Sequence, residues 1–182
     1  VGITGSVGKT STRDMVYSVV KQQYKTLKTE GNYNNNIGLP LTILRLKDEE
    51  VMILEMGMNH LNEMEELSRI ACPDISAITN VGTAHIGELG SRENILKAKL
   101  EIVAGMSDGS TLVINGDNDM LSTVRFDNFK VVKVGVDCAA VFKAEKFILM
   151  DDHSEFTINY NGKVYQVVVP VPGNHFVLNA LV

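Results

Sequence analysis

Near its amino end the chain reads Thr4-Gly5-Ser6-Val7-Gly8-Lys9-Thr10-Ser11, and this stretch decides the fold. Residues 1–4, which precede the glycines, indicate the end of a buried strand. Residues 10–22 predict a helix, because Met15, Val16, Val19 and Val20 recur on one face. A glycine-rich turn between a strand and a helix is typical of α/β proteins, in which parallel strands alternate with helices.

In this context the stretch matches a phosphate-binding loop. Its backbone N–H groups and the start of the helix can bind phosphate oxygens, Lys9 adds a positive charge, and the Thr10 hydroxyl can bind Mg²⁺. The strict pattern places a glycine at position 3, where this chain has Ile3, and Gly5 supplies the flexibility instead. The alternative is a glycine-rich turn without a ligand. The predicted binding set is Gly5, Ser6, Gly8, Lys9, Thr10 and Ser11.

The rest of the chain continues the alternation of strands and helices. Strands are predicted at 51–54, 75–79, 111–114 and 131–134, and helices at 62–72, 92–106 and 175–182. Asn62 and Glu65 have a spacing like that of a capping box, and Ser91 is the expected N-cap of the second of these helices. We therefore expect an α/β fold with a mostly parallel sheet flanked by helices.

From residue 141 the pattern changes. Residues 156–160 and 163–169 alternate or are rich in β-branched residues, and Asn161-Gly162 between them is typical of a type I′ hairpin. Residues 141–170 are therefore predicted to form a small antiparallel β appendage on the parallel core.

Composition excludes several classes of protein. The chain has 182 residues, of which 45% are hydrophobic, so it can bury the core of one domain. Its net charge of −5 and scattered basic residues argue against a nucleic-acid partner. No apolar run approaches the roughly 20 residues of a membrane span. Cys72 and Cys138 lack metal-ligand spacing, which indicates a reducing compartment and a cytoplasmic location.

Two polar side chains follow predicted strands. Glu55 comes directly after 51–54, and His85 follows 75–79 after a short loop. Ligands of open α/β sheets bind at the carboxyl ends of the strands, and Mg²⁺ favours one or two carboxylates with phosphate oxygens and water. Two alternatives stay open: Glu55 only caps the next turn, and His85 is only structural.

Lys99 falls on the apolar stripe of its predicted helix, whereas Lys97 points the other way. The stripe consists of Ile95, Ile102, Val103 and Met106. A buried lysine is costly unless it pairs, snorkels or is chemically altered. Burial also lowers the pKa of the amine, which makes it reactive toward CO₂.

Six segments, taken together, carry a family resemblance. They are GITGSVGKT at 2–10, GNYNNNIGLP at 31–40, EMGMNH at 55–60, TNVGTAH at 79–85, AKLEI at 98–102 and PGNHFVLNAL at 172–181. In this order they resemble the Mur ligases, the cytoplasmic ATP-dependent enzymes that build the peptide stem of the bacterial cell-wall precursor. The match is closest to the branch that adds D-Ala-D-Ala to the UDP-N-acetylmuramoyl tripeptide.

The resemblance implies that residues 1–182 are the central ATP-binding domain of a three-domain ligase. An amino-terminal domain for the UDP-sugar peptide and a carboxyl-terminal domain for the dipeptide would flank it, so we expect a monomeric fragment that is inactive alone. The reaction would pass through an acyl phosphate formed from ATP. Residues 55–59 argue against a tripeptide-forming Mur ligase or a folylpolyglutamate synthase. A nucleotide-binding homologue that is not a ligase is a further alternative, and such homologues often carry zinc-ribbon cysteines.

The resemblance also implies roles for single residues. Lys9 would hold the β- and γ-phosphates, and Thr10 and Glu55 would bind one Mg²⁺. His85 would bind a second Mg²⁺ together with Lys99, which the family carbamylates. Asn36 would lie near the transferred phosphoryl group, and Asn179 would contact adenine. Phe176 departs from the pattern, since the family usually has asparagine directly after this histidine.

Overall fold

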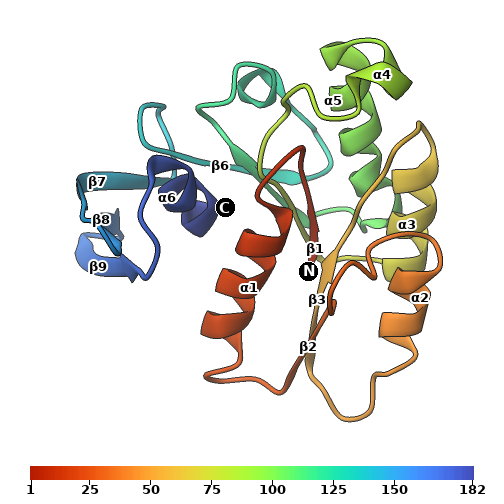
Figure 1. The fold of residues 1–182 in the computed structure, drawn as a ribbon, viewed down its shortest axis with the longest axis horizontal. Helices are drawn as coiled ribbons and strands as arrows, with labels where there is room; N and C mark the ends of the chain where they lie inside the picture. The colour runs from red at the N-terminus through yellow and green to blue at the C-terminus, as the bar shows by residue number, and fades with distance from the viewer.

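Strand β1 (Gly2–Thr4) leads through a tight loop into helix α1 (Lys9–Val20) in the computed structural model, which describes residues 1–182 (Figure 1). The following strands are β2 (Thr26–Lys28), β3 (Val51–Glu55), β4 (Ile75–Ile78), β5 (Thr111–Asn115) and β6 (Lys130–Gly135). The antiparallel strands are β7 (Phe142–Leu149), β8 (Ser154–Tyr160) and β9 (Lys163–Val169). The helices are α2 (Gly38–Ile43), α3 (Glu63–Ala71), α4 (Ile86–Leu89), α5 (Arg92–Leu100) and α6 (Asn174–Leu181), with 3₁₀ turns η1 (Glu101–Gly105) and η2 (Leu121–Thr123).

All nine strands form one sheet in the order β2-β3-β1-β4-β5-β6-β7-β8-β9. Every pair from β2 to β7 is parallel, so the predicted parallel core is confirmed. Strand β1 lies between β3 and β4. The chain places β2 and β3 on one side of β1 and then crosses to place β4 and the later strands on the other side. Such a switch in strand order opens a crevice at the carboxyl ends of the strands.

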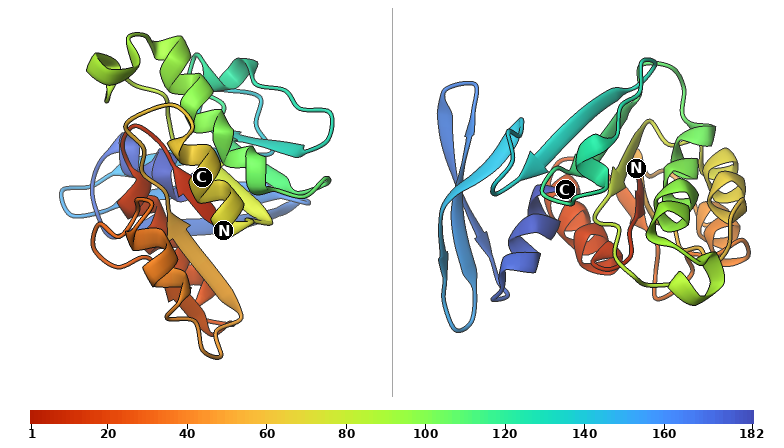
Figure 2. Two further views of the ribbon diagram at one scale, coloured as in Figure 1. Left: turned by 90° about the vertical axis from the view of Figure 1, so that its right-hand side faces the viewer. Right: turned by 90° about the horizontal axis from the view of Figure 1, so that it is seen from above.

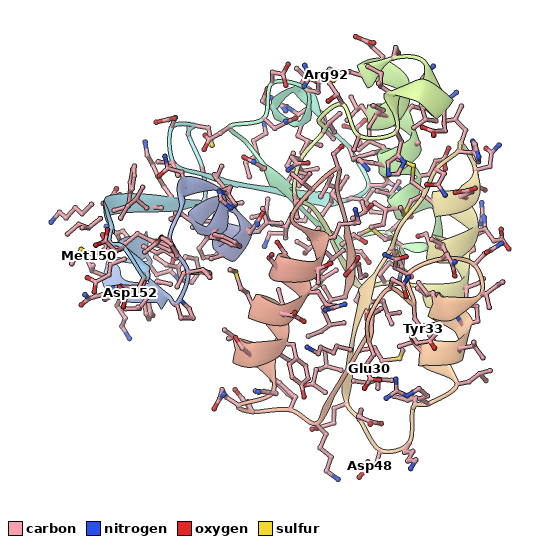
Figure 3. All side chains as sticks on the ribbon, viewed as in Figure 1. Glu30, Tyr33, Asp48, Arg92, Met150 and Asp152 are labelled. Atoms are coloured by element: carbon pink, nitrogen blue, oxygen red, sulfur yellow. The ribbon has the colours of Figure 1, made fainter.

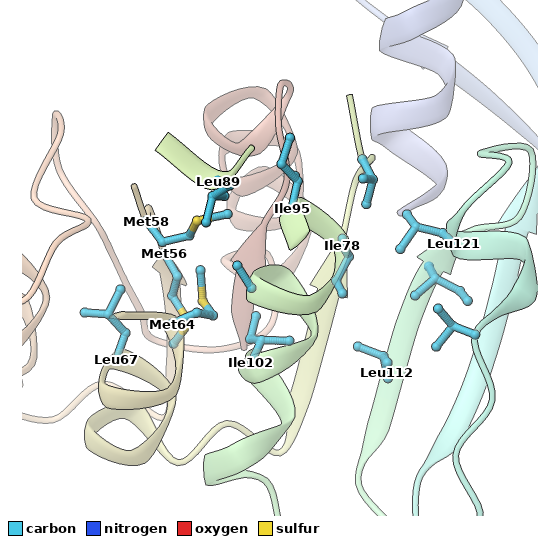
Figure 4. Close-up of a cluster of buried hydrophobic side chains, with 14 of the residues drawn as sticks. Met56, Met58, Met64, Leu67, Ile78, Leu89, Ile95, Ile102, Leu112 and Leu121 are labelled. Carbon is cyan, nitrogen blue, oxygen red and sulfur yellow. The ribbon is translucent and has the colours of Figure 1, made fainter. Parts of the chain in front are cut away.

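Helices cover both faces of this sheet (Figure 2). The larger core lies between the sheet and helices α2, α3 and α5, and Met56, Met64, Leu67, Ile95, Ile102 and Leu112 are among its fully buried members (Figure 4). Helices α1 and α6 pack on the opposite face. Neighbouring residues Ile53 and Leu54 therefore belong to different cores, as expected of a parallel strand buried on both sides. None of the helices combines the length and the apolar character needed to cross a bilayer.

The antiparallel appendage extends the same sheet. Strand β7 pairs in parallel with β6 and antiparallel with β8, so it joins the two parts. The hairpin turn has positive φ at both Asn161 (51°) and Gly162 (75°), as a type I′ turn requires. Met150 and Asp152, in the turn between β7 and β8, lie at the opposite end of the molecule from α3 (Figure 3). The predicted antiparallel β appendage near the C-terminal end is confirmed, and its strands lie within residues 142–169.

Two local expectations about helix ends have different outcomes. Ser91 caps α5 as predicted, because its hydroxyl accepts a hydrogen bond from the Asn94 N–H. The capping box at Asn62 and Glu65 is wrong, since Asn62 has a φ of 71° and its side chain caps nothing. Glu63 instead accepts the N–H groups of Asn59 and His60 at 2.7 and 3.3 Å.

The helix predicted at 92–106 is α-helical only to Leu100 and tightens into η1. The tightening brings Gly105 against the backbone of α3, where a Cβ atom would lie 2.0 Å from the Ser68 carbonyl oxygen. The Gly105 N–H donates to the Ser68 hydroxyl at 2.9 Å, and that hydroxyl donates to the Ile102 carbonyl. The close approach of η1 and α3 therefore depends on a glycine at position 105.

Replacing Gly105 with alanine should destabilise the domain, because the new methyl group meets backbone that cannot move aside as a side chain would. Overpacking of this kind costs about 1–3 kcal/mol, which corresponds to a fall of roughly 2–12 °C in melting temperature for a domain of this size. Thermal unfolding followed by circular dichroism measures it. Gly87→Ala is the matched control, since a Cβ there meets nothing within 4 Å. Equal melting temperatures of the two variants would contradict the packing argument.

Candidate functional site

The loop between β1 and α1, residues 5–9, runs too close to its neighbours for any residue but glycine at two positions. Gly5 has a φ of 155°, and a Cβ there would lie 1.8 Å from the Thr79 hydroxyl oxygen. Gly8 has a φ of 84°, and a Cβ there would lie 2.4 Å from the Asn179 side-chain oxygen. This close approach fixes the path of the loop, called the glycine cradle below, at the start of α1.

The two residues that directly follow β4, Thr79 and Asn80, hold this loop in place. Asn80 accepts the Ser6 N–H at its carbonyl oxygen (3.1 Å) and the Val7 N–H at its side-chain oxygen (3.0 Å). The Thr79 hydroxyl donates to the Val7 carbonyl at 2.6 Å, and the Ser6 hydroxyl accepts the Gly82 N–H at 3.0 Å. Sequence reasoning assigned no part to Asn80, although its position directly after a predicted strand was a usable signal.

Lys9 is the first residue of α1, and its side chain turns back over the loop. Its Nζ donates to the Gly5 carbonyl oxygen at 2.9 Å. Burial lowers the pKa of Lys9, and the negative charge of Glu55 offsets part of this effect. The amine therefore stands beside both the glycine cradle and the carboxylate that ends β3.

Glu55 ends β3 and is only 3% exposed. Its Oε2 accepts the Thr10 hydroxyl at 3.0 Å and Arg13 Nη1 at 3.1 Å, and its Oε1 accepts Asn34 Nδ2 at 2.9 Å. The structure thus brings together Thr10 and Glu55, the two residues predicted to share a metal ion. Sequence reasoning missed Arg13 and Asn34 as partners of Glu55.

A signal for Arg13 was present in the sequence. It lies three and seven residues before Val16 and Val20, so it falls on the apolar face of α1, and it is 5% exposed. The test that singled out Lys99, a cation on an apolar stripe, would have found Arg13 as well.

Lys99 occupies the buried face of α5 as predicted. It is 2% exposed, whereas Lys97 is exposed. No carboxylate forms an ion pair with it. Burial lowers the pKa of Lys99 to about 7, and the positive charge of Lys9 adds to this effect. A large fraction of the amine is therefore neutral near pH 7.

A polar cavity of about 320 Å³ lies beside loop 5–9. Lys9, Asn36 and His85 all line it, so the structure brings these three predicted residues to one place. Its other lining residues are Asn34, Asn35, Gly57, Met58, Asn59, Glu63 and Leu67. Glu30 and Tyr33 are on the same loop between β2 and α2 as these asparagines, and they lie on the opposite side of the molecule from Met150 and Asp152 (Figure 3).

No group of three or more His, Cys, Asp and Glu side chains is gathered in a metal-binding arrangement. Glu55 and His85 therefore do not form a complete cation site by themselves. The donor set at Glu55, one carboxylate beside one hydroxyl, is nevertheless the kind with which Mg²⁺ binds phosphate oxygens and water.

A second cavity, of about 250 Å³, lies on the other side of Gly8. It is lined by Val7, Gly8, Ser11, Thr79, Asn80, Asn115, His175, Phe176, Leu178 and Asn179. The Thr12 hydroxyl donates to the Asn179 carbonyl at 3.1 Å, which ties α1 to α6. The Phe176 ring packs on His175 with centroids 4.2 Å apart. Three predicted residues, Gly8, Ser11 and Asn179, thus share one cavity, and Asn115 at the end of β5 was missed.

Comparison with known proteins agrees with this geometry. The family described as Mur ligase middle domain matches residues 3–182. A UDP-N-acetylmuramoyl-tripeptide–D-alanyl-D-alanine ligase of Bacillus subtilis is 40% identical over 182 residues, which are all of this chain and 39% of that protein. Crystal structure I of MurF from Acinetobacter baumannii has a TM-score of 0.92 at 31% identity and covers 98% of this chain and 40% of that one.

The crystal structure of MurF ligase from Thermotoga maritima in complex with ADP has a TM-score of 0.89 at 28% identity. It covers 99% of this chain and 43% of that one. The chain thus spans about two fifths of the length of the relatives that it matches. A match of one family model over nearly every residue, with a 40% identical relative along the whole chain, shows that the chain belongs to the Mur ligase family.

Proposed function

We propose that the chain is the ATP-binding middle domain of a ligase that joins D-Ala-D-Ala to the UDP-N-acetylmuramoyl tripeptide. The observation that carries the proposal is the arrangement at the ends of β1 and β3, where a glycine cradle and Lys9 stand beside the Thr10–Glu55 pair. The substrates are those in the name of the 40% identical Bacillus relative. Domains for the UDP-sugar peptide and for the dipeptide would flank this chain.

Loop 5–9 would bind the phosphates of ATP. Its backbone follows a path that a side chain at Gly5 or Gly8 would block, and it opens into helix α1, whose N-terminus favours negative charge. Lys9 would release the Gly5 carbonyl and turn its amine toward the β- and γ-phosphates. The adenine base would enter the second cavity, where Asn179 offers an amide and Phe176 an apolar ring.

Thr10 and Glu55 would hold one Mg²⁺, and His85 and Lys99 a second. Lys99 suits this role only if its amine becomes an anion, because a protonated lysine repels a metal. Its neutral amine would attack the carbon of CO₂, form a C–N bond and lose one proton to solvent, which yields a carbamate. That product turns an unpaired buried nitrogen into an oxygen donor. Bound Mg²⁺ would neutralise the phosphate charge.

The chain's residues would support acyl transfer mainly by positioning and electrostatics. The tripeptide carboxylate would take the terminal phosphoryl group of ATP, and the amine of D-Ala-D-Ala would then displace phosphate. Lys9 and Asn36, which line one cavity, would donate to the oxygens of the transferred group. Residues 55–59 argue against a tripeptide-forming Mur ligase and a folylpolyglutamate synthase. A product assay on the longer ligase would distinguish it from a homologue that binds nucleotide but is not a ligase. The cytoplasmic location and the monomeric state stay predictions.

The 182-residue chain should bind ATP with Mg²⁺ and yet form no product. Every residue assigned to nucleotide lies within it, whereas the two acceptor substrates would be oriented by other domains. Loss of that orientation removes a contribution of up to roughly 7–11 kcal/mol. Calorimetry with Mg-ATP and chromatography after incubation with both substrates test the two halves. Efficient ligation by this chain alone would contradict the proposal that other domains orient the two acceptor substrates.

Replacing Lys9 with alanine should weaken ATP binding, because a charge-assisted hydrogen bond to phosphate is lost. Such bonds contribute about 1.5–3 kcal/mol, so the dissociation constant should rise roughly 10- to 150-fold. Lys25→Ala is the matched control, since Lys25 is exposed and pairs only with Asp48. Calorimetry on both variants measures the difference. Equal affinities would remove Lys9 from the phosphate site.

The carbamate at Lys99 should be visible by ¹³C NMR after incubation with labelled bicarbonate. We expect a carbamate carbonyl resonance that disappears in Lys99→Ala and persists in Lys97→Ala. Because the pKa of Lys99 is lowered to about 7, the amine is mostly protonated below that pH, so the signal should be stronger at pH 8 than at pH 6. A longer ligase carrying Lys99→Ala should lose activity and regain part of it with a small added carboxylate. An unlabelled wild-type chain at pH 8 would refute the carbamate.

A further inference from the structure

The Glu55 carboxylate is buried at the end of β3, so a positive charge must compensate it. An ionised carboxylate without a partner in the protein interior is strongly destabilising. Thr10 and Asn34 donate hydrogen bonds to it, but both are neutral. The cation in direct contact is Arg13, with Nη1 3.1 Å from Oε2.

Arg13 is fixed by contacts on several sides. Its Nε donates to Asp14 Oδ1 at 2.9 Å, and its Nη1 also donates to the Gly31 carbonyl at 3.2 Å. Lys28 Nζ lies 2.7 Å from the same Asp14 oxygen. Lys28, Asp14, Arg13 and Glu55 therefore form a row of alternating charges that is neutral as a whole. The row runs from the half-buried Lys28 to Glu55, which is proposed to bind Mg²⁺ together with the Thr10 hydroxyl.

The other cations near the site are not paired with Glu55. The Lys9 amine donates to the Gly5 carbonyl, and no ion pair joins Lys9 to a carboxylate. Lys99 has no ion pair either. Arg13 is therefore the cation in ion-pair contact with Glu55, whereas Lys9 acts on this carboxylate only at longer range.

We propose that Arg13 is a positioning residue that serves as the counter-cation of Glu55 whenever no divalent cation is bound, and that Arg13 and Mg²⁺ compete for the same carboxylate oxygen. The competition half rests on the proposed Mg-ATP site, whereas the counter-cation half does not. A divalent ion at Oε2 adds two positive charges close to the guanidinium, so Arg13 weakens cation binding. In return, the site keeps its geometry when it is empty.

Thermal unfolding of the 182-residue chain tests both halves. In excess chelator, Arg13→Met should lower the melting temperature by roughly 6–20 °C, the cost of breaking a buried pair. Added Mg²⁺ should recover at least half of this loss, because the ion replaces the missing charge, and should shift the wild-type chain much less. A role of Arg13 in packing alone would produce no such Mg²⁺ response.

The double variant Arg13→Met/Glu55→Gln removes both charges and distinguishes charge compensation from packing. It should melt at a higher temperature than Arg13→Met in chelator and show no response to Mg²⁺. The double variant also decides the matter if Arg13→Met fails to fold in chelator. Arg45→Met, which breaks the exposed pair with Glu30, should stay within about 4 °C of the wild type.

Two outcomes would overturn the counter-cation role: an unchanged melting temperature of Arg13→Met in chelator, or a double variant no more stable than the single one. An Arg13→Met chain that Mg²⁺ fails to stabilise would overturn the competition if Mg-ATP still stabilises the wild type. Absence of any Mg-ATP effect on the wild-type chain would instead count against the proposed function. The comparison in chelator between the single and double variants would stand in that case.

Discussion

The parallel pairing of β1 with both β3 and β4 is the constraint on which the rest of the site depends. Because parallel strands end at the same edge, loop 5–9, Glu55 and Thr79 meet although they lie up to 74 positions apart in the chain. The pairing also brings loop 5–9 so close to the end of β4 that Gly5 cannot carry a side chain. Backbone geometry therefore builds the cradle before any charged side chain contributes.

Charged side chains are then accommodated inside this frame in two different ways. Glu55 is buried with a cation and two neutral donors, so its charge is compensated locally. Lys99 is buried without an anion, and the protein responds by lowering its pKa to about 7. Burial therefore favours the neutral form of this amine. A buried amine with a lowered pKa, as at Lys99, is typical of functional sites.

The sequence predicted those features of the fold and the site that depend on neighbouring residues alone. Asn161-Gly162 predicted its turn because few residues tolerate two successive positive φ angles, and Lys99 was found because apolar neighbours flank it at helical spacing. Asn62 was misjudged because the N–H groups around the start of α3 are accepted by Glu63, a local contact, and by Glu101, which is 39 residues away from Asn62. Asn34 and Asn80 were missed because their partners, Glu55 and Val7, are 21 and 73 residues away.

The hydrogen bond from Thr12 to the Asn179 carbonyl joins residues 167 positions apart. The Asn179 side chain also lies against Gly8, so the last helix forms part of the wall around the first loop. Closing so long a stretch of chain is entropically expensive and slow compared with forming a local hairpin. During synthesis loop 5–9 emerges early, whereas its contact residue Asn179 follows only after almost the whole domain has been made. Thr79 and Asn80 can hold the loop without α6, but the side of the loop at Gly8 is completed only when the helix that carries Asn179 docks on α1.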